Sequence, residues 1–251
     1  MLPSGNAVDV SNRRPYPGLQ NASETTDALP KRILILAFPW ENKVGPMTVK
    51  LAKSEQTLQA IVRTALKIAV VEGLHAVTLG EVAKRLDISK SGVFARVGSL
   101  EALQHKVIVE YGRIFADNVF LPALSEPRGL PRLNAIMRLW IGRGTGENAM
   151  AGGLHTAAAF DLDHVESALR DLLLESVMNW RAELKRTIVQ CIDEGHLRPG
   201  TDPTQLTFEI NALMIGFLHD ARFVRDPRAH ERAAEAYDRL ISTYRSVSHA
   251  T

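Results

Sequence analysis

Cationic side chains that could bind phosphate occur in the stretch 90–97. Val93 and Val97 are one helical turn apart and mark the inner face of a short helix. Lys90 and Arg96 do not belong to that face, so their side chains can point outward. Lys and Arg neutralise the phosphates of nucleic acids. The pattern therefore indicates a helix with a phosphate-binding face, and a plain solvated surface is the alternative interpretation.

Two short helices joined by a tight turn would position this face. Thr78 followed by Glu81 forms a capping box that begins a first helix of about two turns. Asp87 tolerates the left-handed conformation that a turn requires. Ser89 is a favourable N-cap for the second helix. The spacing predicts a helix-turn-helix over 78–97, with an ordinary helical hairpin as the alternative.

The positive charge of the chain is concentrated around this motif. The 251 residues carry a net charge of +2, whereas residues 47–106 carry +4 and residues 107–251 carry −3. This asymmetry favours a nucleic-acid partner. The single cysteine, Cys191, excludes internal disulfides and suits a reducing cytoplasm. No apolar run is long enough for a transmembrane helix, so we expect no membrane partner.

Residues 1–50 differ from the rest of the chain. They contain six prolines and show no sustained helical period, so we expect them to be disordered. The apolar run 33–38 is an isolated strand candidate. Met47 precedes the start of the helical pattern, and we expect the natural product to begin there.

From Ser54 onward the hydrophobic period is helical, which predicts an all-α fold. The first helix ends at Gly73, and Ser99 caps a helix that ends before Pro122. The helix after Asp202 is apolar around most of its circumference, so the last helix or a second subunit must cover it. The remaining expected helices cover about 131–141, 149–160, 163–194, 203 onward after Asp202-Pro203, and 227–246 after Asp226-Pro227.

The stretch 57–107 resembles the N-terminal domain of TetR-type transcriptional regulators. The resemblance is densest in TLGEVA at 78–83, ISKSGVF at 88–94 and GSLEAL at 98–103. It implies a helix-turn-helix DNA-binding domain at 51–100 and a helical ligand-binding and dimerisation domain at 101–247. It also implies a cytoplasmic homodimer that binds a palindromic operator in double-stranded DNA, usually as a repressor. A small-molecule effector of unknown identity then releases the DNA.

The same resemblance implies which residues contact DNA. The candidates are Thr78, Lys90, Ser91, Gly92, Phe94, Arg96 and Ser99. Phe94 replaces a common Tyr, and contact with a thymine methyl group would substitute for the lost phosphate bond. Leu100 replaces a usual Lys, which removes another expected phosphate contact, although the backbone amides near Ser99 still offer a helix N-terminus. Lys50 and Lys53 are further candidates for backbone contacts.

Other chemical groups are weaker candidates for a function. The weak ligand-binding candidates are Trp140, Phe160, Met178 and Trp180, for which plain core packing is the alternative. The side chains of His155, Asp161, Asp163 and His164 are metal-ligand types, but their spacing fits no zinc or iron site, so we expect no metal and no cofactor. No nucleophile-and-base pattern indicates an enzyme. An all-helical adaptor that has lost operator recognition is the alternative function.

Overall fold

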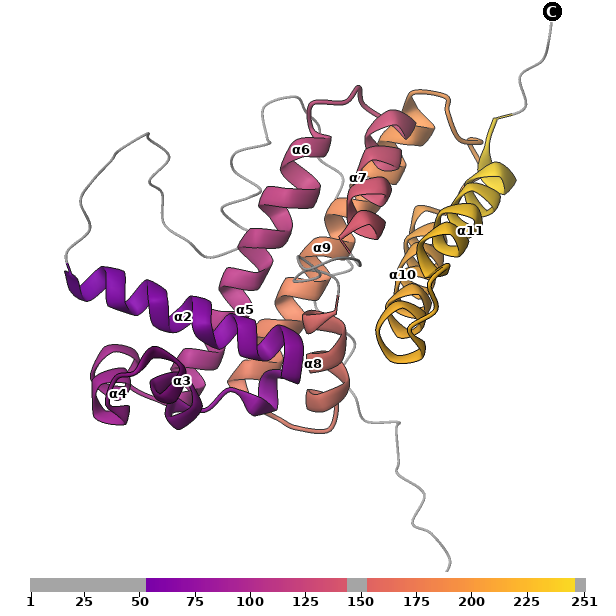
Figure 1. Ribbon diagram of the computed structural model, residues 1–251. Coiled ribbons are helices and arrows are strands. Elements are labelled where there is room, and N and C mark those ends of the chain that lie inside the picture. The colour runs from indigo at the N-terminus through magenta and orange to yellow at the C-terminus, as the bar shows by residue number, and fades with distance from the viewer. Residues whose placement is uncertain (1–52, 144–152, 247–251) are drawn as a thin grey trace, which may run out of the picture.

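Helices make up nearly all the regular structure of the chain (Figure 1). The computed structural model describes residues 53–143 and 153–246. Within these ranges the only β pairing is an isolated bridge between Leu197 and Arg245, so the predicted all-α fold is confirmed. The expected disorder of 1–50, the strand at 33–38 and the start at Met47 lie outside the described residues.

The helices follow one another with short connections. Their bounds are α2 (Lys53–Glu72), η1 (Leu74–Ala76), α3 (Leu79–Leu86), α4 (Lys90–Val97), α5 (Leu100–Phe115), η2 (Ala116–Phe120), α6 (Leu121–Ala123), α7 (Leu130–Gly142), α8 (Leu154–Leu162), α9 (Ala168–Asp193), α10 (Pro203–His219), η3 (Asp220–Val224) and α11 (Ala229–Tyr244). No helix of the described residues is long and apolar enough to cross a membrane.

The turn between α3 and α4 forms as the sequence predicts. The Thr78 hydroxyl accepts a hydrogen bond from the Glu81 amide at 3.1 Å, which caps α3. Asp87 ends α3 in the left-handed conformation, with φ 52° and ψ 46°. The Ser89 hydroxyl accepts from the Gly92 amide at 3.0 Å and caps α4. Each cap satisfies an amide that the helix itself leaves without a partner.

One hydrophobic core holds the two motif helices against α2 and α5. Ile61 from α2, Val82 from α3, Val93 from α4 and Leu103 from α5 are all fully buried in it. The same core includes residues of α8 and of the start of α9. The motif is therefore packed directly against the helices that follow it. The boundary between a DNA-binding domain and a ligand-binding domain at residue 100 stays a prediction.

The helix that Ser99 caps ends before Pro122, and the chain after it remains helical. The Ser99 hydroxyl caps α5 as predicted, by accepting from the Ala102 amide at 3.0 Å. After Phe115 the chain widens into the π-helical turn η2 and then enters α6, where Pro122 lies in the first turn. Proline clashes with the preceding turn of a regular α-helix, and a π-turn widens the backbone at that place. α5 itself ends at Phe115, so the prediction that this helix ends before Pro122 is confirmed, whereas the helical turns η2 and α6 that follow were not predicted.

Two further helix starts differ from their predictions. α9 begins after Ser167, whose hydroxyl accepts from the Arg170 amide at 3.2 Å, and not at Asp163, which follows the end of α8. α11 begins at Ala229 and not at Pro227, because the Asp226 carboxylate accepts from the Arg228 amide and forms a turn first. Asp202 does cap α10, with Pro203 in its first turn, as predicted.

A second core joins α7, α9, α10 and α11. Leu133, Leu184 and Ile210 are fully buried in it. Cys191 lies in the same core, where its thiol donates to the Thr187 carbonyl oxygen at 3.2 Å. Burial raises the pKa of this thiol to about 12, so it stays protonated and unreactive at neutral pH.

Candidate functional site

The outer face of α4 presents the residues that the sequence predicts for DNA contact. Lys90, Ser91 and Arg96 are exposed, and Phe94 is exposed over 55% of its surface. Gly92 lies in the first turn, where a Cβ atom would come within 3.0 Å of the Ser89 hydroxyl. The structure therefore brings these candidates together on one short helix that the core supports from behind.

The cations of α4 are not neutralised by carboxylates of the described chain. The Arg96 guanidinium donates to the Gly92 carbonyl oxygen at 2.9 Å, and neither Arg96 nor Lys90 has an ion pair among the described residues. Arg85 in α3 differs, because it pairs with Glu72 at 2.6 Å and with Glu81 at 2.8 Å. Lys90 and Arg96 thus keep a positive charge for an anionic partner, whereas Arg85 serves the protein itself.

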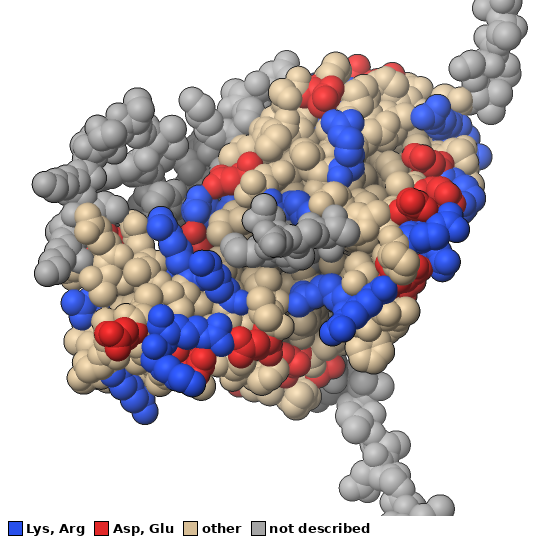
Figure 2. Space-filling model, viewed as in Figure 1, with Lys and Arg blue, Asp and Glu red and all other residues tan. Residues whose placement is uncertain are grey.

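Figure 2 shows Lys and Arg side chains over the end of the molecule that carries α3 and α4, with a few carboxylates between them. Two more candidates lie at the edges of this end. Thr78 and Ser99 are both exposed, and their oxygen atoms accept from the first turns of α3 and α5. Leu100 begins α5 and is 38% exposed. Lys50 and the side chain of Lys53 lie outside the described part of the chain.

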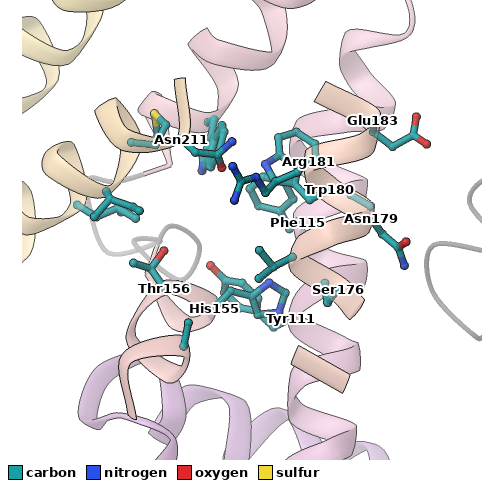
Figure 3. Close-up of a pocket in the computed structure, with 18 of the residues that line it drawn as sticks. Tyr111, Phe115, His155, Thr156, Ser176, Asn179, Trp180, Arg181, Glu183 and Asn211 are labelled. Carbon is teal, nitrogen blue, oxygen red and sulfur yellow. The ribbon is translucent and has the colours of Figure 1, made fainter. Parts of the chain in front are cut away.

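A cavity of about 220 Å³ lies among α5, α8, α9 and α10 (Figure 3). Its wall is mostly apolar and aromatic, with a few polar side chains at separate points, as in small-molecule sites. The aromatic and polar residues that line it are Tyr111, Phe115, Phe120, Trp140, His155, Thr156, Phe160, Ser176, Asn179, Trp180, Arg181, Glu183 and Asn211.

Four aromatic rings form one side of the cavity. The ring centroids of Trp140 and Trp180 are 5.1 Å apart, and Phe115 lies edge-on to both, at 5.7 Å and 4.7 Å. Phe120 extends the cluster at 6.4 Å from Trp180. Trp140, Trp180 and Phe160 line the cavity among the predicted ligand-binding candidates, whereas Met178 does not. Met178 belongs to α9, but the cavity lies beside its neighbours Val177 and Trp180.

His155 closes the opposite end of the cavity. Its ring packs on that of Tyr111, with the centroids 4.6 Å apart, and its Nε2 atom is buried with no hydrogen-bond partner in the described residues. Burial lowers the pKa of His155 to about 4, against a smaller opposing effect of a hydrogen bond to the backbone of Ile108. The imidazole is therefore neutral at physiological pH.

This buried histidine predicts a specific acid sensitivity. The unfolded chain takes up a proton at His155 near pH 6.5, whereas the folded chain takes it up only near pH 4. Stability therefore falls as the pH falls through this window, by roughly 3 kcal/mol in total. We expect His155→Gln to remove this loss, so that chemical unfolding at pH 7 and pH 4 shows a smaller difference for the variant. Equal differences for both proteins would contradict the assignment.

The four residues weighed for a metal site do not come together. His155 lies against Tyr111 in the cavity wall, while Asp161 contacts His75 at 4.0 Å and Asp163 contacts His164 at 2.9 Å. Within 53–143 and 153–246 no group of three or more potential metal ligands forms.

Several cavity residues were not among the sequence candidates. Phe115 and Tyr111 appeared in the sequence as part of a helical apolar stripe, whose spacing does not distinguish a cavity wall from core. Arg181 lies in the middle of a long helix, where a lone arginine gives no signal of a ligand. Only the packing of α5, α8, α9 and α10 shows that these side chains share a cavity.

Comparisons with known proteins agree with this arrangement. Residues 129–237 match the family model of the tetracyclin repressor-like C-terminal domain. A TetR-family regulator from Cytophaga hutchinsonii is similar in structure, with a TM-score of 0.67 and 19% identity over 78% of this chain and 98% of that one. A TetR regulator from Chloroflexus aurantiacus has a TM-score of 0.67 and 18% identity over 76% and 96%.

A third structure was solved with a small molecule. This transcriptional regulator from Saccharomonospora viridis, in complex with choline, has a TM-score of 0.65 and 15% identity over 75% of this chain and 96% of that one. The search of curated proteins finds no match to the chain. At these identities the structural similarity concerns the fold alone.

Proposed function

The chain belongs to the TetR family of transcriptional regulators, and we propose that it binds a palindromic operator as a homodimer and releases it when a small molecule fills the cavity. The observation that carries this proposal is the pairing of two features in one chain. A helix-turn-helix presents cations that no described carboxylate neutralises, and a cavity lies behind it in the helical C-terminal part. Repression is the mode we propose, since an occupied operator near a promoter blocks transcription.

The proposed DNA contacts follow from the exposed faces of α3 to α5. Lys90 and Arg96 would neutralise phosphates or read guanine, and the ring of Phe94 would contact a thymine methyl group. Ser91 and Gly92 lie in the first turn of α4, where the backbone can approach DNA closely. The list of proposed contacts is completed by Thr78 and Ser99, whose helix N-termini attract phosphate.

The proposed dimer uses the apolar face of α10 and η3. Phe208, Ile215, Phe223 and Val224 are exposed over 56%, 44%, 81% and 56% of their surfaces. In Figure 1, α10 and α11 lie side by side on the side of the molecule away from α4. Large exposed apolar side chains on two consecutive helical elements indicate an interaction surface. A second copy of the chain would cover them and set the separation of the two α4 helices, which must match the half-sites of an operator.

Two connections would carry a signal from the cavity to the DNA-binding part. The first is α5, which begins directly after α4 and reaches the cavity at Tyr111 and Phe115. The second is Arg222 in η3, whose Nη2 atom donates to the Val70 carbonyl oxygen of α2 at 2.7 Å. A Cβ atom at position 153 would collide with this guanidinium, so Gly153 makes room for the contact. A ligand that shifts α5 or η3 would change the position of the motif.

The alternative is an all-helical adaptor that has lost operator recognition. The exposed Phe94 and Leu100 favour it, because neither side chain can bond a phosphate. The free positive charges of Lys90 and Arg96 favour the operator-binding proposal instead. No catalytic activity forms part of either proposal.

A gel-shift experiment with the promoter DNA that flanks the protein's own gene tests the proposal. We expect a shift that resists competitor DNA and weakens as the salt concentration rises, because binding releases counterions from phosphates. The same fragment with its palindrome scrambled is the control. No competitor-resistant shift on any nearby promoter would favour the adaptor.

A further inference from the structure

Arg181 is the distinctive charged group of the cavity. It lines the cavity from α9, is only partly exposed, and forms no ion pair or hydrogen bond with any residue that the structure describes. Two other arginines of the same helix do pair, Arg170 with Asp171 at 3.7 Å and Arg186 with Glu183 at 3.5 Å. A guanidinium removed from water needs acceptors for its five N–H groups. Arg181 is therefore ready for an acceptor that enters the cavity.

Figure 3 shows where this guanidinium lies. Arg181 extends from α9 into the cavity, toward the side of Asn211, whereas Glu183 and Asn179 point away from it. The Glu183 carboxylate contacts Arg186, and burial raises the pKa of Glu183 despite that arginine. Glu183 is the single carboxylate among the described residues of the lining, and it thus offers little opposition to the binding of an anion.

Further positive charge lies near the other end of the cavity. Burial raises the pKa of Tyr111, and a hydrogen bond to the backbone of Leu154 and the positive charges of Arg143 and Arg222 act against that rise. The Nε atom of Arg143 is buried with no partner in the described residues. The electrostatic field around the cavity therefore favours a negative ligand over a positive one.

The remaining wall of the cavity favours a ligand whose other part is apolar. The rings of Phe115, Trp140 and Trp180 contact one another edge-to-face and form an apolar wall. The indole Nε1 of Trp180 is buried and has no hydrogen-bond partner in the described residues, so it can donate to a ligand oxygen after a small shift. A cavity of about 220 Å³ exceeds one that holds benzene, which indicates a ligand on the order of ten to fifteen non-hydrogen atoms.

We propose that the effector is a small organic anion, with an aromatic or alkyl body against the aromatic wall and a carboxylate bound by Arg181. The planar guanidinium fork matches a carboxylate in a bidentate pair, which strengthens in a dry environment. The inference rests on the proposed function, because it names the ligand class of the same cavity.

Calorimetry on the full chain without DNA tests this assignment. The probes are 2-naphthoate, 4-phenylbutyrate and octanoate, each compared with its uncharged amide. We expect the wild type to bind at least one carboxylate tenfold or more tightly than the matching amide. In Arg181→Gln the carboxylate affinity should fall at least tenfold, while the amide affinity stays within threefold. Arg181→Lys keeps the charge but loses the fork, so part of the preference should remain.

Arg170→Gln is the matched control, because it removes an arginine of the same helix that neither lines the cavity nor pairs with a residue that does. It should keep the carboxylate preference. The melting temperature of Arg181→Gln should not fall, since a partly buried cation without a partner does not stabilise the fold. A wild type without carboxylate preference for all three probes, or an Arg181→Gln that keeps it, would overturn the proposal.

The gel shift separates this result from the proposed function. Carboxylate preference without operator binding would leave the ligand class standing and reject the regulator. Operator binding without carboxylate preference would support the regulator and reject the proposed ligand class.

Discussion

The double variant Phe208→Asp with Phe223→Asp is expected to be a monomer that binds operator DNA at least about a hundredfold more weakly than the wild type. In the single chain both side chains are exposed, so the substitutions cost the fold little. In a dimer each would place a carboxylate in an apolar contact, which is strongly unfavourable without a partner charge. A monomer has one α4 helix to place in the DNA, whereas the two half-sites of a palindromic operator bind two such helices.

Sedimentation velocity and gel shift on the same samples check this result. Val71→Asp is the control, because Val71 is 75% exposed on α2 and is not one of the four exposed apolar residues of the proposed dimer surface. We expect the Val71 variant to keep the sedimentation coefficient of the wild type. A double variant that remains dimeric would show that another surface forms the dimer.

Arg96→Ala is expected to weaken operator binding by about tenfold to a hundredfold without unfolding the dimer. The side chain is exposed and donates only to the Gly92 carbonyl oxygen of its own helix, so its loss removes charge and leaves the core intact. Because the dimer carries the residue twice, loss of a phosphate contact would reduce the salt slope by about two. A guanine contact would instead relax discrimination between operator variants.

Fluorescence anisotropy at several salt concentrations distinguishes these outcomes. The control is Arg138→Ala, which removes the same charge from α7, where the side chain is 70% exposed. Affinity within threefold of the wild type is expected for this control. An unchanged affinity of Arg96→Ala at fixed salt would remove Arg96 from the DNA interface.

Local chemistry explains the parts of the fold that were predicted well. Thr78, Ser89, Ser99 and Asp202 each cap the helix that follows, because a side-chain oxygen and the amides two or three residues later lie within the same turn. Asp87 adopts the left-handed conformation for a similarly local reason. Where two local signals competed, the prediction failed. Ser167 and not Asp163 caps α9, since Asp163 follows the last residue of α8 and the Ser167 hydroxyl accepts from the Arg170 amide.

The cavity was predicted only in part. Trp140 and Trp180 were candidates by residue type, but Met178 has the same apolar character and does not line the cavity. From the sequence, His155 was considered only as a metal ligand. In the structure it is buried against Tyr111 and forms part of the cavity wall. No sequence pattern marked Arg181 as a ligand-binding residue, since its position in the cavity wall depends on neighbours from α5, α8 and α10.

The sequence by itself determined the order of the helices, the caps at Thr78, Ser89, Ser99 and Asp202, and the exposed character of Lys90 and Arg96 on α4. These features depend on residues within a few positions of one another, where spacing and hydrogen-bonding chemistry act directly. Only the tertiary structure decided that Arg181 has no partner in the described chain and that aromatic rings from α5, α7, α8 and α9 face one cavity. Such contacts join residues up to about a hundred positions apart, and helix packing, which no local pattern encodes, brings them together.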